Sequence, residues 1–95
     1  MRTDTILEIG IDELERLYIK PATEKFTLVY RTATEVSWDN NGYFLFSPKP
    51  RRWSYLDWYK HIVDVTKNEC GCVLQITEKT IWKNITQELK IDICK

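Results

Sequence analysis

The stretch from Tyr43 to His61 gathers the residues of this chain that are best suited to recognising another molecule. It contains seven of the twelve aromatic residues and four basic residues. Aromatic and arginine side chains are enriched at the centres of protein interfaces, because each buries a large area at little entropic cost. We therefore predict a protein-binding surface in which Trp53 and Tyr55 are aromatic anchors and Arg51 and Arg52 pair with carboxylates. The predicted surface comprises Tyr43, Lys49, Arg51, Arg52, Trp53 and Tyr55.

The same segment also fits single-stranded nucleic acid, because bases stack on aromatic rings and phosphates pair with Arg and Lys. The overall charge speaks against this alternative, since 14 Lys and Arg residues balance 14 Asp and Glu residues. No RNP, KH or zinc-finger pattern supports it either. A purely structural role is a third interpretation: the aromatic residues would fill the core, and the two arginines would hold a loop against carboxylates or carbonyls.

Three cysteines and the single histidine raise the question of a metal site. Cys70, Cys72, Cys94 and His61 supply four ligand types that zinc accepts, but one Cys-x-Cys without a second pair departs from the usual spacing. We expect no metal ion and no other cofactor. Because the number of cysteines is odd and we expect a reducing compartment, we also expect free thiols.

The surroundings of His61 resemble those of an acid–base catalyst. Asp57 precedes it by four residues and Asp64 follows by three, so all three share one helical face. A histidine oriented by a carboxylate is the core of many catalytic sites, although a solvated helix face has the same pattern. The chain has no nucleophile elbow, phosphate-binding glycine loop or dinucleotide fingerprint. We therefore expect no catalytic residue, and a protein that is not an enzyme.

Length and composition predict a single globular domain over residues 1–95, with 43% hydrophobic and 29% charged residues. No apolar run approaches the ~20 residues that cross a bilayer, and the N-terminus lacks a signal-peptide core. We expect a cytoplasmic protein that does not bind membranes. Charge is uneven: residues 1–24 carry six acids against three bases, whereas residues 43–61 carry four bases against one acid.

Hairpins are predicted in the first half of the chain. Residues 5–11 and 16–20 have the pattern of a first hairpin, with a helix over 11–18 as the competing interpretation. Residues 26–31 are rich in β-branched and aromatic residues and predict a strand, which 35–38 continue in extended form. The Asn41-Gly42 pair predicts a tight turn with positive φ angles, and 43–46 return as a strand covered on both faces.

A helix from about Tyr55 to Glu69 is the best-marked element. Ser54 and Asp57 have the spacing of a capping box, and Trp53 and Trp58 have the spacing of a hydrophobic staple. Gly71 is suited to end the helix in the left-handed conformation. Strands over 72–77 and 80–82 follow.

The tail over 84–93 fits either a strand or a helix, and Asn84 with Gln87 favours a short C-terminal helix. These elements predict an α+β fold, with an antiparallel sheet built from hairpins and the main helix packed on one face.

The order of hairpin and helix resembles the small single-domain α+β proteins of bacterial mobile elements. The run that carries the resemblance is Trp38-Asp39, Ser47-Pro48, Trp53-Ser54-Tyr55 and Trp58-Tyr59. Two groups share this character: immunity proteins of toxin systems and integron gene-cassette proteins. Resemblance to immunity proteins implies a protein that blocks a toxin by binding it. Immunity proteins against nucleases are often acidic, and the neutrality of this chain departs from that pattern.

Taken together, the sequence predicts a non-enzymatic protein-binding domain, of immunity type or an accessory protein of a mobile element. The expected partner is another protein, or a second copy of the chain that pairs through an exposed sheet edge. A single-stranded nucleic acid is the alternative ligand.

Overall fold

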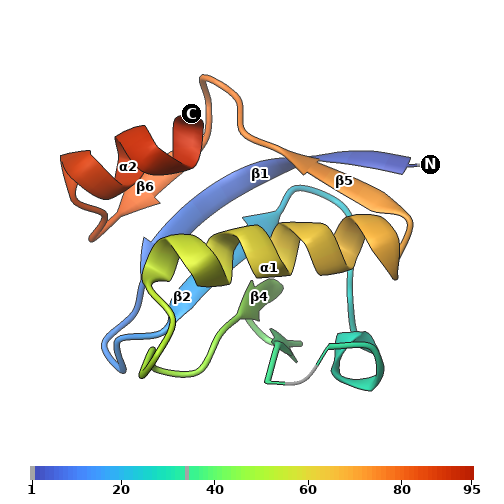
Figure 1. The fold of residues 1–95 in the computed structure, drawn as a ribbon. Coiled ribbons are helices and arrows are strands. Elements are labelled where there is room, and N and C mark those ends of the chain that lie inside the picture. Colours follow the sequence, from blue (N-terminus) through green and yellow to red (C-terminus); the bar gives the residue numbers. More distant parts are fainter. Residues whose placement is uncertain (1, 34) are drawn as a thin grey trace.

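The first strand, β1 (Arg2–Ile11), is the centre of the sheet in the computed structural model, which describes residues 2–33 and 35–95. Strand β2 (Leu17–Pro21) pairs antiparallel with one edge of β1, as the predicted first hairpin requires. Strands β5 (Cys72–Gln75) and β6 (Ile81–Lys83) pair parallel with β1, one after the other (Figure 1). The sheet is therefore mixed, and the prediction of an antiparallel sheet was wrong in this respect. The long crossover through the main helix brings the chain back in the parallel direction.

A second hairpin extends the sheet beyond β2. Strand β4 (Phe44–Phe46) pairs antiparallel with both β2 and β3 (Ser37–Asp39), which gives the strand order β3-β4-β2-β1-β5. The turn differs from the predicted Asn-Gly turn, because the positive φ, 58°, falls on Tyr43. One carboxylate oxygen of Asp39 accepts the backbone N–H groups of Asn41 (2.8 Å) and Gly42 (3.0 Å), and these bonds lower the pKa of Asp39.

The predicted strand over 26–31 is absent from the described residues. The chain instead forms a 3₁₀ helix, η1 (Val29–Arg31). The buried residues in and around this helix, Phe26, Val29 and Ala33, recur at intervals of three and four. Apolar spacing of this kind is helical, so the β-branched composition of the segment was the wrong guide. The Phe26 ring packs edge-on against Trp38 with centroids 5.9 Å apart, which ties the segment to β3.

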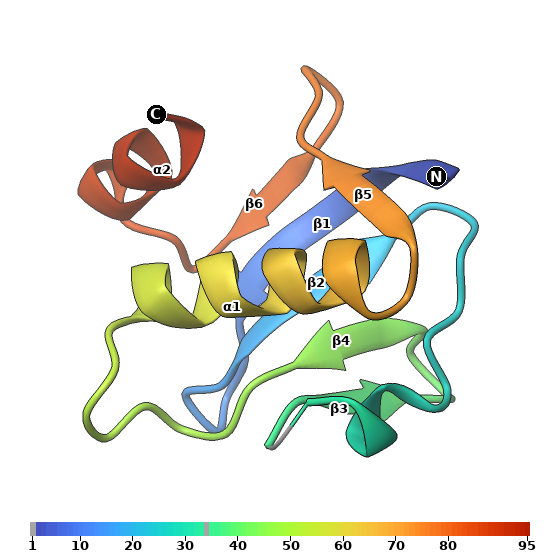
Figure 2. The same ribbon diagram turned by 45° about the vertical axis from the view of Figure 1, so that its right-hand side comes forward.

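The main helix, α1 (Tyr55–Asn68), begins and ends as the sequence predicts. The Asp57 N–H donates to the Ser54 hydroxyl (3.1 Å) and the Ser54 N–H donates to the Asp57 carboxylate (3.2 Å), which completes the capping box. After the helix, Gly71 takes a φ of 69°. The helix crosses the face of the sheet, as Figure 2 shows.

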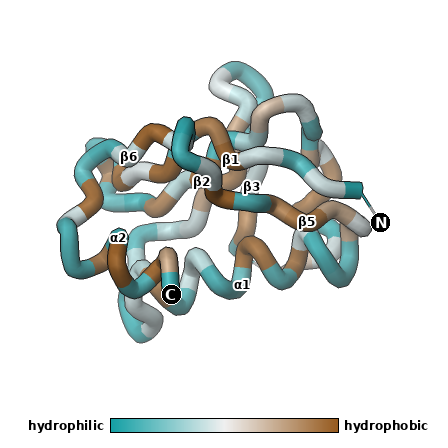
Figure 3. The backbone as a smooth tube through the Cα atoms, turned by 90° about the horizontal axis from the view of Figure 1, so that it is seen from above, coloured by the Kyte–Doolittle hydropathy of each residue, from teal (hydrophilic) through white to brown (hydrophobic). Residues whose placement is uncertain are grey.

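The tail forms the predicted short helix, α2 (Gln87–Cys94), which packs beside α1 on the same side of the sheet (Figure 3). Its N-cap is Thr86 rather than Asn84, since the Thr86 hydroxyl accepts from the Leu89 N–H (3.1 Å). Asn84 has a positive φ of 55° and donates its side-chain amide to the Ile11 carbonyl (3.1 Å). Within residues 2–33 and 35–95, no helix has the length and apolar character that a membrane span needs.

The core lies between the inner face of the sheet and α1. The side chains of Ile9, Ile19 and Leu45 from three neighbouring strands are fully buried, as is Ile62 from α1. Full burial of such side chains contributes roughly 1.5–3 kcal/mol each. The apolar residues of α1 recur at intervals of three and four, which places them on the one face of the helix that packs on the sheet.

Asp4 of β1 is a buried carboxylate with a structural role. It accepts the backbone N–H groups of Thr5 (2.9 Å), Thr23 (3.0 Å) and Glu24 (2.8 Å), and the Thr23 hydroxyl (3.1 Å). Burial alone would raise the pKa of Asp4, but the bonds from Glu24 and Thr23 outweigh it and hold this pKa below its ordinary value. The charged form of Asp4 therefore fixes the turn that follows β2.

We predict that Asp4→Asn lowers the free energy of unfolding at neutral pH by about 1–3 kcal/mol, because an amide cannot accept all of these bonds. The folded-state pKa of Asp4 is depressed, so its contribution is present above its unfolded pKa and is lost as pH falls through the folded value. Urea denaturation from pH 7 to pH 2 should thus show the variant and the wild type converging in acid. The exposed Asp64→Asn change is the control, and equal losses in both variants would contradict this account of Asp4.

Candidate functional site

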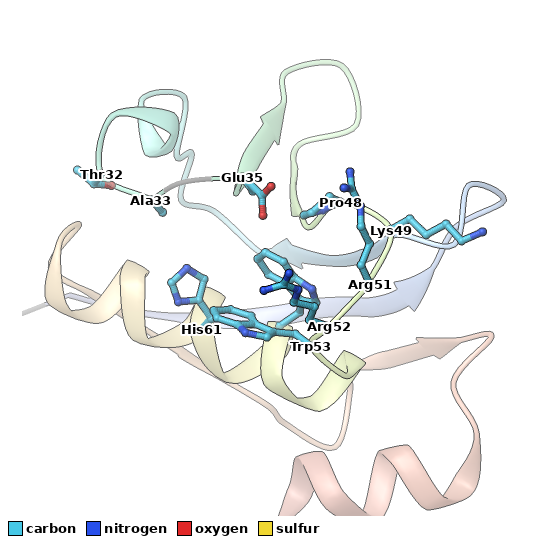
Figure 4. A pocket seen from close by; sticks show the side chains of 10 residues that line it. Thr32, Ala33, Glu35, Pro48, Lys49, Arg51, Arg52, Trp53 and His61 are labelled. Atoms are coloured by element: carbon cyan, nitrogen blue, oxygen red, sulfur yellow. The ribbon is translucent and has the colours of Figure 1, made fainter.

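A cleft of about 660 Å³ opens between the first turns of α1 and the segment that leads into β3 (Figure 4). Its volume is within the range of binding pockets for small ligands and side chains. The residues that line it come from three parts of the chain: Thr32, Ala33 and Glu35; Pro48, Lys49, Arg51, Arg52 and Trp53; and Trp58 and His61. We call this feature the basic cleft.

The loop over 48–53, which carries most of these residues, is fixed to the sheet where it begins. Ser47 is fully buried, and its hydroxyl accepts the Leu17 N–H (3.2 Å) and donates to the Pro48 carbonyl (2.8 Å). The Ser47 N–H also donates to the Leu17 carbonyl (2.9 Å). The capping box at Ser54 fixes the other end. Both ends of the loop are therefore held by serine hydrogen bonds, which position Arg51, Arg52 and Trp53 at the cleft.

Aromatic rings form one wall of the basic cleft. Trp53, which precedes the N-cap, contacts Trp58 at the fourth helical position with ring centroids 4.7 Å apart, as the predicted hydrophobic staple requires. The His61 ring stands edge-on to both, 5.1 Å from Trp53 and 5.8 Å from Trp58. Trp58 is buried, whereas Trp53 remains 44% exposed. The wall thus presents an indole to incoming molecules.

Arg51 and Arg52 are the cations that distinguish the cleft. Both are exposed, and neither forms a hydrogen bond or an ion pair with any residue of 2–33 or 35–95. Lys49 differs, because its ammonium group pairs with Glu15, which raises its pKa, and in Figure 4 it extends away from the cleft. The contacts of the described chain therefore do not support the interpretation that the two arginines hold a loop against carboxylates.

Glu35 is the single carboxylate among the lining residues, and it reaches into the cleft from the wall opposite His61 (Figure 4). Its backbone has a φ of 68°, in the left-handed region that disfavours residues with a side chain. Such a conformation costs of order 1–3 kcal/mol. No ion pair joins Glu35 to either arginine within the described residues. Because Lys49 is paired with Glu15, the two arginines against one carboxylate leave the lining with a positive excess.

Trp58 also contributes an unused polar group. Its indole N–H is buried and has no acceptor among residues 2–33 and 35–95. Leaving a buried donor without a partner costs about 1–3 kcal/mol, so nearly all such groups in folded proteins find one. Trp58 is therefore both a staple residue and a lining residue of the cleft whose indole N–H is unpartnered among the described residues.

Four of the six predicted surface residues come together at the cleft: Lys49, Arg51, Arg52 and Trp53. Tyr55 is not among the lining residues, because its ring packs on the core and its hydroxyl donates to the Glu15 carbonyl (3.0 Å). Tyr43 lies at the other end of β4 from the loop and is 47% exposed, with the Lys25 ammonium 5.0 Å from its ring centre. These two tyrosines are therefore separate from the site.

The binding surface predicted from the sequence does not include the other six lining residues, of which Pro48 lies within the predicted loop. The sequence spacing places Trp58 in the hydrophobic staple alone. It suggests His61 for acid–base catalysis or metal binding instead of the binding surface. The spacing of Trp58 and His61, three residues apart on one helix, could have placed both beside Trp53. Nothing in the sequence pointed to Thr32, Ala33 or Glu35, whose position depends on packing between distant segments.

The residues that the sequence suggests for catalysis and metal binding are His61, two aspartates of α1 and the three cysteines. Asp57 serves the capping box, and no hydrogen bond or ion pair links His61 to Asp57 or Asp64 in the part of the chain that the structure describes. Cys70 is half-buried, Cys72 buried and Cys94 exposed, and burial raises the pKa of both Cys70 and Cys72. Across 2–33 and 35–95, no three His, Cys, Asp or Glu side chains gather as a metal site would need.

A second, smaller hollow of about 370 Å³ lies on the outer face of the sheet, beside β1 and β2. Of its three carboxylates, Glu8 accepts the Tyr18 hydroxyl and lies 3.8 Å from the Lys83 ammonium. The Tyr18 ring lies over Gly10, where a Cβ atom would collide with it. Glu8, Tyr18 and Lys83 of this hollow are thus paired with one another, in contrast to the two arginines of the basic cleft.

Comparison with known proteins identifies the family. The model of the integron cassette protein Hfx_Cass5 family matches residues 4–80. The chain belongs to this family. One solved structure, the integron cassette protein Hfx_Cass5 from the mobile metagenome of North West Arm Sewage Outfall, is 34% identical. The match covers 98% of this chain and 93% of that chain, with a TM-score of 0.52. A search of curated proteins gave no match.

Membership of the Hfx_Cass5 family confirms one of the two resemblances read from the sequence, that to integron cassette proteins. The matched residues include the loop over 48–53 and the first turns of α1, so the basic cleft lies within the family region. The cleft offers guanidinium groups, an exposed indole and a buried indole N–H in one place. This combination suits a ligand that carries carboxylates beside apolar surface.

We predict that Ser47→Ala lowers the free energy of unfolding by about 1–3 kcal/mol, because the buried Leu17 N–H loses its acceptor. Thermal denaturation checks this, with Ser37→Ala as the control, since the Ser37 side chain makes no hydrogen bond with the described residues. If Ser47→Ala were as stable as the control, the loop would not depend on this anchor.

Proposed function

We propose that this cassette protein is a non-enzymatic binding domain whose basic cleft takes an acidic segment of a partner protein. The observation that carries the proposal is the pair of exposed arginines, Arg51 and Arg52, which meet no carboxylate among the described residues. Unpaired guanidinium groups at a fixed loop are suited to bidentate carboxylate binding, and Trp53 supplies the adjacent apolar anchor.

The cleft favours an acidic protein segment over a nucleic acid strand. Single-stranded nucleic acid needs a positive groove that follows its backbone, and the net charge of this chain is zero. Glu35 also lies within the cleft, where it would repel successive phosphates. A short acidic peptide needs only one or two carboxylates near the arginines. An immunity-type role, in which the partner is a toxin, would be one use of such binding.

The proposal predicts that Arg51→Ala combined with Arg52→Ala weakens binding of hexaglutamate at least about tenfold, since each charge-assisted bond contributes roughly 1.5–3 kcal/mol. The melting temperature should stay nearly unchanged, because the arginines have no partner to lose. Binding is measured by the change in intrinsic tryptophan fluorescence, at one fixed salt concentration, with hexaglutamine as the uncharged probe.

Lys60→Ala combined with Lys67→Ala is the matched control, because it removes the same charge from exposed sites on α1 outside the cleft. Equal weakening in both double variants would show only a general charge effect. Tighter binding of oligothymidylate than of hexaglutamate, with a steep loss of affinity as salt rises, would favour the nucleic-acid alternative. A large fall in melting temperature would show that the arginines are structural.

A second prediction concerns Glu35. Glu35→Gln should strengthen hexaglutamate binding several-fold, because it removes the one carboxylate that repels the probe from inside the cleft. Glu13→Gln is the control, since Glu13 is exposed and lies outside the cleft. Unchanged affinity in Glu35→Gln would place the probe elsewhere on the protein.

A further inference from the structure

Two tryptophans of the chain have buried indole N–H groups with no acceptor among residues 2–33 and 35–95, namely Trp38 and Trp58. Of these two, Trp58 alone lines the basic cleft. Its side chain is only 6% exposed, so the indole lies largely within the protein. Buried indole N–H groups ordinarily have an acceptor, which makes a ligand the natural source of one.

The rings around Trp58 determine how a ligand would reach this donor. Trp53 and His61 both contact it, with centroids 4.7 Å and 5.8 Å away. The Trp58 nitrogen itself is shielded from solvent, so an acceptor reaches it only after a neighbouring group moves. Trp53 is suited to move, because it is 44% exposed, precedes the helix and makes no side-chain hydrogen bond with the described residues. Exposed side chains change rotamer within nanoseconds.

The charged residues near Trp58 determine which ligand group can accept its indole N–H. Arg52 lines the same cleft without a partner, and Figure 4 places it between Glu35 and the Trp53 ring. A carboxylate has two oxygens, so one can accept from a guanidinium group while the other accepts from an indole N–H. A more highly charged phosphate would meet stronger repulsion from Glu35. A single carboxylate is therefore the group that fits both donors.

We propose that the Trp58 indole N–H is the deep donor of the basic cleft, and that it binds a ligand carboxylate once the Trp53 ring has moved aside. The inference rests on the proposed function and adds the chemistry of the group that enters. A free carboxylic acid and an acidic side chain of a peptide share this chemistry, so the test must separate them.

The test follows the four indole N–H resonances of the full-length, ¹⁵N-labelled protein by NMR during titration with hexaglutamate and, separately, with acetate. We expect the Trp58 resonance to move downfield and saturate, while that of Trp38 stays in place. Trp58→Phe and Trp38→Phe assign the two signals and serve as matched variants. Trp58→Phe should weaken hexaglutamate binding about tenfold, and Trp38→Phe should leave it unchanged.

The outcomes separate this inference from the proposed function. Movement with acetate as well as hexaglutamate supports the inference and shows that a free carboxylic acid is sufficient. Movement with hexaglutamate alone supports it with a peptide as the source. A static Trp58 resonance, while the backbone amides of Arg51 and Arg52 shift, would overturn the inference and leave the proposed function intact. Absence of any binding would overturn both.

Discussion

The pairing of β1 along both of its edges is the constraint on which the rest of the structure depends. Its partners come from opposite parts of the chain, β2 from residues 17–21 and β5 and β6 from residues 72–83. Where the chain passes from β5 to β6, the Thr80 hydroxyl donates to the Ile6 carbonyl (2.7 Å) and accepts the Thr77 N–H (3.0 Å). Because the β1–β2 hairpin also positions β4, the loop over 48–53 is held by the same central strand. The basic cleft is thus a product of the whole fold.

The basic cleft combines a fixed loop backbone with side chains that have no hydrogen-bond or ion-pair partner among the described residues. Ser47 and Ser54 hold the two ends of its loop, so little backbone entropy remains to be lost when a ligand binds. Arg51 and Arg52 meet no partner among the described residues, and the buried N–H of Trp58 is in the same condition. Nearly all buried donors in folded proteins have an acceptor, so the unpartnered N–H of Trp58 is unusual. Fixed backbone and unpaired donors together favour binding over a purely structural role.

Elements defined by neighbouring residues could be predicted from the sequence, and those defined by distant contacts could not. The capping box of Ser54 and Asp57 located α1, and the alternation of polar and apolar residues located the β1–β2 hairpin. The parallel pairing of β5 and β6 depends on where the crossover returns, which no local pattern records. The same holds for the site: Arg51, Arg52 and Trp53 are adjacent in sequence and were identified, whereas Glu35 enters from a segment that was predicted to be extended.

The chain is a member of the Hfx_Cass5 family of integron cassette proteins. The proposed binding site rests on the unpaired Arg51 and Arg52. The most direct test of that site is a map of backbone amide shifts in the ¹⁵N-labelled protein as hexaglutamate is added. Our account predicts that the largest shifts fall at Ala33, Arg51, Arg52 and Trp53. Largest shifts around Tyr18 and Phe44, on the outer face of the sheet, would contradict it.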